Sequence, residues 1–267
     1  MLPEHDMRVL APSISRILEI DVPKNAETSH LPELVEDLEG IKRLAVIVED
    51  AFGVSTWEKA WDYSPFFNSL SAFHYTHISS VMPSITPVNF ATMLTGASPD
   101  VHQIKDRTEK LALETIFDTL RAEGKTSGTA ARGLSSLGIL ISPHADNPGI
   151  ATSNTDEEVR KIACNQLNNH YDLVWVQLLD IDDASHKNGP YSLEAMKAVK
   201  RADNNLRFIA ETAYKEGYGV ISLADHGQHP ITEAGDVEGT HGTDSYEDTT
   251  VPLVWCNQED LRRIFST

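Results

Sequence analysis

The chain has 267 residues, and its 22 lysines and arginines against 40 aspartates and glutamates give a formal net charge of −18. This length suits one large domain or two small ones, and 40% hydrophobic residues is the content of a globular protein rather than of a disordered chain. A surface this acidic repels phosphate backbones, which disfavours a nucleic-acid binder that relies on basic patches. A small anionic substrate is still compatible if metal ions supply positive charge at the site.

The two cysteines, Cys164 and Cys256, share no metal-ligand spacing. Two free thiols in a reducing cytoplasm are favoured over a single disulfide between them. Residues 1–21 contain no signal-peptide core, and no apolar run approaches the roughly 18 residues that span a bilayer. We therefore expect a cytoplasmic protein with no membrane association.

Apolar and polar residues alternate along the chain in a way that predicts both strands and helices. Residues 31–40 are typical of a short acidic helix that ends at a glycine, and the continuous apolar run at 44–48 indicates a strand buried on both faces. Further along, the pattern predicts helices over 58–73, with an interruption at Pro65, and over 86–94, 111–123, 156–169 and 193–216. It predicts strands over 77–81, 126–131, 172–179, 218–224 and 251–255. This alternation predicts an α/β fold with a largely parallel central sheet and helices on both faces.

The three strongest predicted strands end in acidic or histidine residues. The first is followed by Glu49 and Asp50, the second by the acidic residues of segment 180–183, and the third by Asp225 and His226. Ligands of open α/β sheets bind beyond the carboxyl ends of the strands. Three distant segments are therefore expected to bring carboxylates and imidazoles to one edge of the sheet.

These strand ends carry side chains that suit metal ions. Asp182 and His186 lie four residues apart, Asp225 precedes His226, and His241 lies between Thr240 and Gly242. Aspartate and histidine without cysteine suit Zn, Mn or Fe rather than an iron–sulfur centre. About six such ligands, with Asp50 included, are too many for one tetrahedral zinc but suit two metals roughly 4 Å apart. Each pair alone has the alternative of a surface turn or a helix N-cap.

A hydroxyl group precedes one predicted helix, in the segment 82–90. Thr86 could act as a nucleophile if a metal held by Asp50, or the helix N-terminus, lowers the pKa of its hydroxyl. Asn89, one turn later, could donate its amide to a phosphoryl oxygen. The alternative is that Ser84 or Thr86 only caps the helix.

Together these blocks resemble the alkaline phosphatase superfamily, most of all its nucleotide pyrophosphatase/phosphodiesterase and phosphonoacetate hydrolase branches. The family pattern has an apolar strand ending in Asp-Gly, a Pro-x-x-Thr-x-x-Asn segment, Asp-x-x-x-His, Asp-His-Gly and a final Gly-x-His-Gly. Matching blocks occur in the same order over residues 44–255: Val48 to Gly53, Pro83 to Asn89 with Thr95-Gly96, Pro99 and His102, Asp182 to His186 with Gly189-Pro190, Asp225 to Gly227, and Gly239 to Gly242.

The resemblance implies a role for each matching position. Asp182, His186 and His241 would hold one metal, and Asp50, Asp225 and His226 would hold the other. Thr86, beside the metals, would attack phosphorus and form a phosphothreonine, and Asn89 would help to bind the phosphoryl oxygens. The implied cofactors are two divalent ions, with Zn preferred and Mn or Fe as alternatives.

The chain departs from the family pattern at several positions. Ala51 stands where the family commonly has glycine, and Glu49 is an alternative to Asp50 as a ligand. Asp183 is an extra acid that could compete with Asp182 or lie outside the ligand set. Four bases could meet a leaving group, with nothing to select among them: Lys105, Arg107, Arg132 and Lys187.

The organisation expected from these blocks is an N-terminal extension, residues 1–40, packed on a phosphohydrolase domain, residues 41–267. Larger family members insert a cap after the nucleophile helix, and here residues 132–155 are expected to form a reduced cap or active-site loop.

The function expected is a two-metal phosphodiesterase or nucleotide pyrophosphatase that acts on a small phosphorylated substrate. The alternatives are a phosphomonoesterase or a phosphonate hydrolase with the same site. A phosphomutase-type isomerase is disfavoured by the short chain, and a non-catalytic phosphate-ligand binding protein by the complete ligand set.

Overall fold

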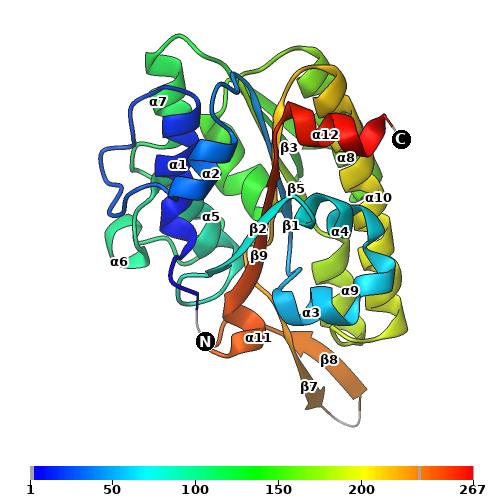
Figure 1. Cartoon of the computed structure of the whole chain (residues 1–267). Coiled ribbons are helices and arrows are strands. Elements are labelled where there is room, and N and C mark those ends of the chain that lie inside the picture. Colours follow the sequence, from blue (N-terminus) through cyan, green and yellow to red (C-terminus); the bar gives the residue numbers. More distant parts are fainter. Residues whose placement is uncertain (1–2, 234–235, 267) are drawn as a thin grey trace.

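The computed structural model describes residues 3–233 and 236–266. Its centre is a seven-stranded sheet in the order β2-β9-β6-β1-β5-β3-β4, in which β9 alone runs antiparallel to its neighbours (Figure 1). The strands are β1 (Leu44–Glu49), β2 (His74–Ser79), β3 (Ser127–Arg132), β4 (Asn147–Ala151), β5 (Leu173–Leu178), β6 (Gly219–Leu223) and β9 (Thr250–Cys256). A separate hairpin of β7 (His229–Glu233) and β8 (Asp236–Thr240) projects from the body. The predicted α/β fold is confirmed.

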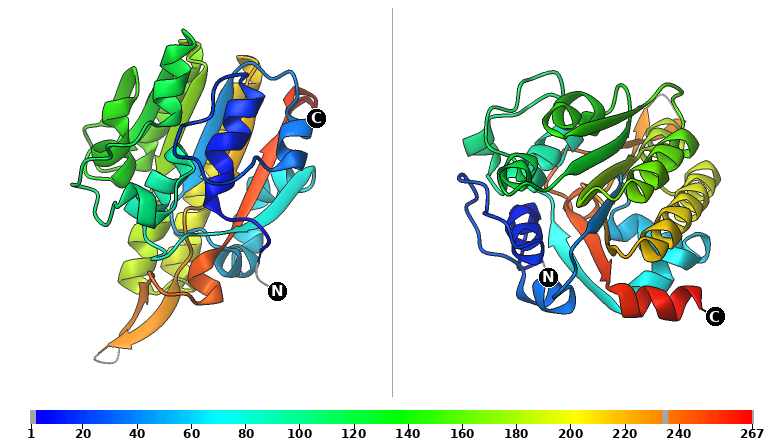
Figure 2. Two further views of the ribbon diagram at one scale, coloured as in Figure 1. Left: turned by 90° about the vertical axis from the view of Figure 1, so that its left-hand side faces the viewer. Right: turned by 90° about the horizontal axis from the view of Figure 1, so that it is seen from above.

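Helices cover both faces of the sheet, as the view from above shows (Figure 2). One layer holds α1 (Leu10–Ile17), α2 (Pro32–Asp37), α5 (Thr86–Thr95), α6 (Pro99–His102) and α7 (Ile116–Ala122). The other holds α4 (Pro65–Ser71), α8 (Asp156–Asn168), α9 (Asp180–Asn188), α10 (Leu193–Lys215) and α12 (Gln258–Phe265). The short helices α3 (Val54–Lys59) and α11 (Tyr246–Thr249) lie beside β9. Single turns are η1 (Met7–Val9), η2 (Trp61–Tyr63), the π-helical η3 (Leu137–Ile141) and η4 (Ser142–His144).

Strands β1 and β5 lie at the centre because their sequences are apolar on both faces. Every residue of each is buried, as expected for a parallel strand between two helix layers. The side chains of Leu10 and Ile14 in α1 and Leu34 in α2 belong to the same hydrophobic core. Residues before β1 therefore pack on the sheet.

Several predicted helices begin or end elsewhere. The helix expected over 58–73 is divided into α3, η2 and α4, because Pro65 occupies the first turn of α4 and begins a helix there. The helix expected from residue 111 begins only at Ile116. Thr115 and Asp118 form a capping box there, in which each side chain accepts from the other's main-chain N–H.

Residues 132–155, expected to form a reduced cap or active-site loop, include regular secondary structure. They contain η3, η4 and β4, and β4 is an edge strand of the main sheet, parallel to β3. Their glycine-rich composition has a packing reason, because a Cβ on Gly149 would lie 2.2 Å from the Thr129 carbonyl oxygen and 2.4 Å from the Ile162 side chain. Glycine here permits close packing of β3, β4 and α8 rather than a flexible loop.

Cys164 and Cys256 are free thiols, as predicted. Among the described residues, no helix has the length and apolar character needed to cross a membrane.

Candidate active site

The predicted site residues lie beyond the carboxyl ends of three adjacent strands, β6, β1 and β5 (Figure 1). Asp50 follows β1, and Asp182 and His186 lie on α9 directly after β5. Asp225 and His226 follow β6. His241 comes at the end of β8, so the projecting hairpin separates it from His226 along the chain. Thr86 is the first residue of α5.

Two groups of potential ligand atoms form where these segments meet. Asp50, Asp225 and His226 make one group, and Asp182, His226 and His241 make the other; within each group the ligand atoms lie within 4.8 Å of one another. His226 is common to both, and His186 Nε2 lies 3.3 Å from Asp182 Oδ1. The structure thus brings all six proposed ligands together, and their division between two metals stays a prediction.

The three histidines are oriented by main-chain carbonyl groups. The Nδ1 atoms of His186, His226 and His241 lie 2.9, 3.0 and 2.9 Å from carbonyl oxygens of Gly239, Gly227 and Ser84. When Nδ1–H donates to a carbonyl, the Nε2 lone pair is left for another partner. This is the form in which histidine binds a metal.

Asp50 and Asp225 each have one oxygen held by a hydrogen bond and another without a donor. Asp50 Oδ2 accepts from Gln177 Nε2 at 2.6 Å, and Asp225 Oδ1 accepts from the Ala51 N–H at 3.3 Å. Asp50 Oδ1 and Asp225 Oδ2 are buried with no hydrogen-bond partner, and they lie 3.4 and 3.5 Å from His226 Nε2. Buried carboxylate oxygens are costly without a donor or a cation, so this donor set fits a divalent metal.

The pKa values of Asp225, Asp50 and His241 lead to the same conclusion. Burial, followed by repulsion from Asp182, raises the pKa of Asp225 to about 7, and burial likewise raises that of Asp50 well above its ordinary value. Burial lowers the pKa of His241 to about 4. Without a cation, these carboxylates resist ionisation, and a bound metal would favour their charged form.

Thr86 lies at the junction of the two ligand groups. Its Oγ1 is 3.1 Å from Nε2 of His226, the residue common to both. The side chain is half-buried at the N-terminus of α5, where the helix dipole favours negative charge. A hydroxyl in this position can approach a phosphoryl group bound between the ligand groups.

The side chain of Asn89 faces the main chain. It is fully buried, its Oδ1 accepts from the Val81 N–H at 2.8 Å, and its Nδ2 lies 3.2 Å from the Ile85 carbonyl oxygen and 3.4 Å from that of Val81. These contacts hold the segment that leads to Thr86. A contact between Asn89 and a phosphoryl oxygen stays a prediction.

The departures from the family pattern have structural counterparts. Ala51 has φ of +64°, a conformation that glycine adopts without cost. Glu49 points away from Asp50, as alternate residues of a strand do, and its Oε1 accepts from Ser222 Oγ at 3.2 Å. Asp183 contacts Arg132 rather than the ligand groups.

Two glutamines beside the ligands were not found from the sequence. Gln177 binds Asp50, and Gln228 Nε2 lies 2.5 Å from Asp182 Oδ1. Gln177 is fully buried in β5, so a polar residue inside an otherwise apolar run was the available signal. For Gln228, the sequence gives no signal beyond its position two residues after His226.

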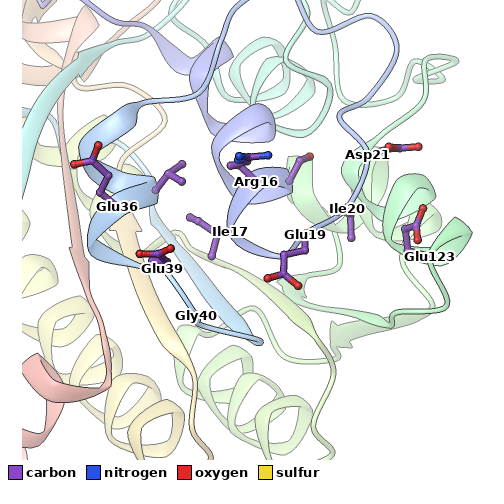
Figure 3. A pocket seen from close by; sticks show the side chains of 11 residues that line it. Arg16, Ile17, Glu19, Ile20, Asp21, Glu36, Glu39, Gly40 and Glu123 are labelled. Carbon is purple, nitrogen blue, oxygen red and sulfur yellow. The ribbon is translucent and has the colours of Figure 1, made fainter.

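An acidic hollow lies at the opposite edge of the sheet. It has a volume of about 590 Å³ and is lined by residues of α1, α2 and the end of α7, among them Arg16, Glu36, Glu39 and Glu123 (Figure 3). Gly40, which precedes β1, also lines it, whereas Asp50 follows β1. Within residues 3–233 and 236–266, the groups of side chains that could hold a metal ion lie at the other end of the strands, with Asp50.

Two family models match the sequence. One described as the metalloenzyme superfamily matches residues 144–262, and one described as type I phosphodiesterase / nucleotide pyrophosphatase matches residues 44–112. A comparison with curated proteins finds no match.

Solved structures of low sequence identity share the fold. Phosphonoacetate hydrolase from Sinorhizobium meliloti 1021, in complex with phosphonoformate, has a TM-score of 0.58 at 17% identity over 72% of this chain. This chain covers 58% of that protein's length. Murine ectonucleotide pyrophosphatase / phosphodiesterase 5, as an inactive threonine-to-alanine variant with AMP, has a TM-score of 0.62 at 14% identity over 81% of this chain and 88% of its own. The periplasmic domain of phosphoethanolamine transferase EptC from Campylobacter jejuni has a TM-score of 0.58 at 14% identity, covering 79% and 78% of the two chains.

These matches confirm the resemblance to the alkaline phosphatase superfamily. The metalloenzyme family model over residues 144–262 agrees with the two groups of potential metal ligands, four of whose five residues lie in that range.

Proposed function

We propose that the protein is a two-metal phosphodiesterase or nucleotide pyrophosphatase that uses Thr86 as its nucleophile. The observation that carries this proposal is the place of Thr86 Oγ1, 3.1 Å from the histidine common to both ligand groups. A metal-binding module needs no hydroxyl at this junction, whereas transfer of a phosphoryl group to the protein does.

In this proposal, Asp182, His186 and His241 hold one divalent ion, and Asp50, Asp225 and His226 hold the other. Zinc is preferred, with Mn or Fe as alternatives. Such ions, when bound, lower the pKa of a neighbouring hydroxyl and offset negative charge on phosphoryl oxygens.

Thr86 and the loop before it supply the remaining chemistry. Oγ1 attacks phosphorus as the bond to the leaving-group oxygen breaks, which gives a phosphothreonine that water then hydrolyses. Asn89 makes hydrogen bonds to the main chain of Val81 and Ile85. The N-terminus of α5 is therefore held in place while Thr86 Oγ1 forms its bond to phosphorus. The inactive threonine-to-alanine variant of the murine neighbour supports a threonine nucleophile by analogy.

The test compares bis-p-nitrophenyl phosphate with p-nitrophenyl phosphate, with and without added Zn or Mn. Wild type, Thr86→Ala, Thr86→Ser and the exposed-loop control Thr108→Ala are assayed, and bound metal is measured by elemental analysis. We expect a metal-dependent preference for the diester, a loss of about 10³-fold or more in Thr86→Ala, partial activity in Thr86→Ser, and no change in the control.

Each other outcome has a definite meaning. Full activity in Thr86→Ala would refute the nucleophile, and preference for the monoester would establish a phosphatase with the same site. Two bound metals without cleavage of either ester would favour a phosphonate hydrolase, to be assayed with phosphonoacetate. Failure to bind metal would refute the proposal.

A further inference from the structure

Arg132 is buried and stands at the centre of a cluster of ion pairs next to the proposed active site. It is the last residue of β3, and only 3% of its surface is exposed. Nη2 lies 2.6 Å from Asp156 Oδ1 and 2.5 Å from Asp180 Oδ1, and Nη1 lies 2.6 Å from Asp183 Oδ2. One guanidinium thus joins carboxylates from α8 and α9, a geometry that a planar fork of donors allows and a lysine does not.

The same cluster holds the main chain at the start of α9. Asp156 Oδ2 accepts from the N–H groups of Leu179 and Asp180, at 2.9 and 2.7 Å. Arg201 Nε binds the second oxygen of Asp180 at 2.8 Å from the solvent side. The turn from β5 into α9 is therefore fixed by contacts both to its main chain and to its side chains.

Asp182 lies within this turn, between Asp180 and Asp183, which are two of the three carboxylates that Arg132 contacts. Asp180 and Asp183 both point to the guanidinium, whereas Asp182 points to His186, His226 and His241. Three of four consecutive residues in this turn carry a carboxylate, so something must decide which of them faces the metal centre. In this structure, Arg132 contacts Asp180 and Asp183, and Asp182 faces the histidines.

Arg132 is also not free to bind a substrate. Oxygens of three carboxylates lie within 2.6 Å of its Nη atoms and occupy its donors. Arg132 is therefore no longer a candidate for contact with a leaving group.

We propose that Arg132 is a positioning residue: it holds Asp180 and Asp183 away from the metal centre and so leaves Asp182 as the ligand that α9 presents. This inference rests on the proposed metal centre. It predicts that loss of the guanidinium fork weakens one metal site selectively, because Asp182 becomes misaligned and Asp183 is released to compete with it.

The experiment is a titration of metal-free protein with Co²⁺, followed by absorption spectroscopy and by calorimetry. Arg132→Lys keeps the charge but not the fork. Arg201→Lys is the matched control, because it changes an exposed contact to the same Asp180. We expect Arg132→Lys to weaken one of the two Co²⁺ sites by about 10- to 100-fold and to change its absorption bands, while the other site and the Arg201→Lys protein change less than about threefold.

A double variant separates positioning from simple destabilisation. Asp183→Asn alone should keep both metals, and Arg132→Lys/Asp183→Asn should recover part of the lost affinity because the competing carboxylate is gone. Equal weakening of both sites, or no recovery in the double variant, would overturn the proposal. Loss of a metal in Asp183→Asn would make Asp183 the ligand and would also overturn it.

Two further controls complete the design. If Arg132→Lys does not fold by circular dichroism, Asp156→Asn loosens the same cluster and is expected to show the same selective loss. Co²⁺ binding is measured without substrate. A wild type that binds two ions but cleaves no phosphoester would therefore contradict the proposed function alone.

Discussion

Replacing Asn89 by alanine distinguishes two roles of this residue. In the structure its side chain makes hydrogen bonds to the main chain of Val81 and Ile85, and it is fully buried. Truncation leaves the buried Val81 N–H unpaired, which costs about 1–3 kcal/mol, and removes bonds to two carbonyl groups at about 0.5–1.5 kcal/mol each. Because the bond at 3.4 Å is long, we expect a loss of about 2–4 kcal/mol in the free energy of unfolding.

The assay is urea unfolding of metal-free protein, followed by circular dichroism, with diester hydrolysis measured on the same samples. Asn204→Ala is the matched control, since Asn204 is exposed on α10 and its side chain donates to the Lys200 carbonyl group. Its unfolding free energy should change by less than about 0.5 kcal/mol. A stable Asn89→Ala protein that loses only kcat would refute the anchoring role and establish a contact with the phosphoryl group.

Two further predictions follow from buried polar contacts. Burial lowers the pKa of His102 to about 4, and its Nδ1 accepts from the Ile104 N–H at 3.0 Å. The unfolded chain then binds a proton more readily at this residue, so the contribution of His102 to stability falls as pH drops below about 6.5. In urea titrations, the unfolding free energy of the wild type relative to His102→Gln should fall by about 2 kcal/mol between pH 7 and pH 5. Gln177→Leu leaves the Leu137 N–H and Asp50 Oδ2 without partners; it should cost about 2–4 kcal/mol in unfolding free energy and about tenfold in Zn²⁺ affinity. Unchanged pH dependence in the first case, or unchanged Zn²⁺ affinity in the second, would contradict these assignments.

Much of the fold could be predicted from local sequence pattern. The apolar runs of β1 and β5 mark strands buried on both faces, and the acids and histidines after them place the site at the carboxyl edge. Helix boundaries were less accurate, because Pro65 can either break a helix or begin one. The capping box of Thr115 and Asp118 likewise moves the start of α7 to Ile116, five residues after the start expected from the apolar pattern.

What could not be predicted depends on contacts between distant residues. Arg132 was one of several bases with no distinguishing feature until β3, α8 and α9 were placed side by side. The same holds for residues 132–155. Their small residues are typical of a loop, but Gly149 is small because β3 and α8 approach it closely.

The central position of β1 has a consequence for folding during synthesis. Leu44 pairs with Leu173 in β5 and with Gly219 in β6, both made long after it. Both edges of β1 therefore stay unpaired while most of the chain is translated, which makes folding slow and exposes the nascent chain to aggregation. His241 follows both of these partner strands in the chain, so the ligand group of Asp182, His226 and His241 can form only after β1 has paired with strands made much later.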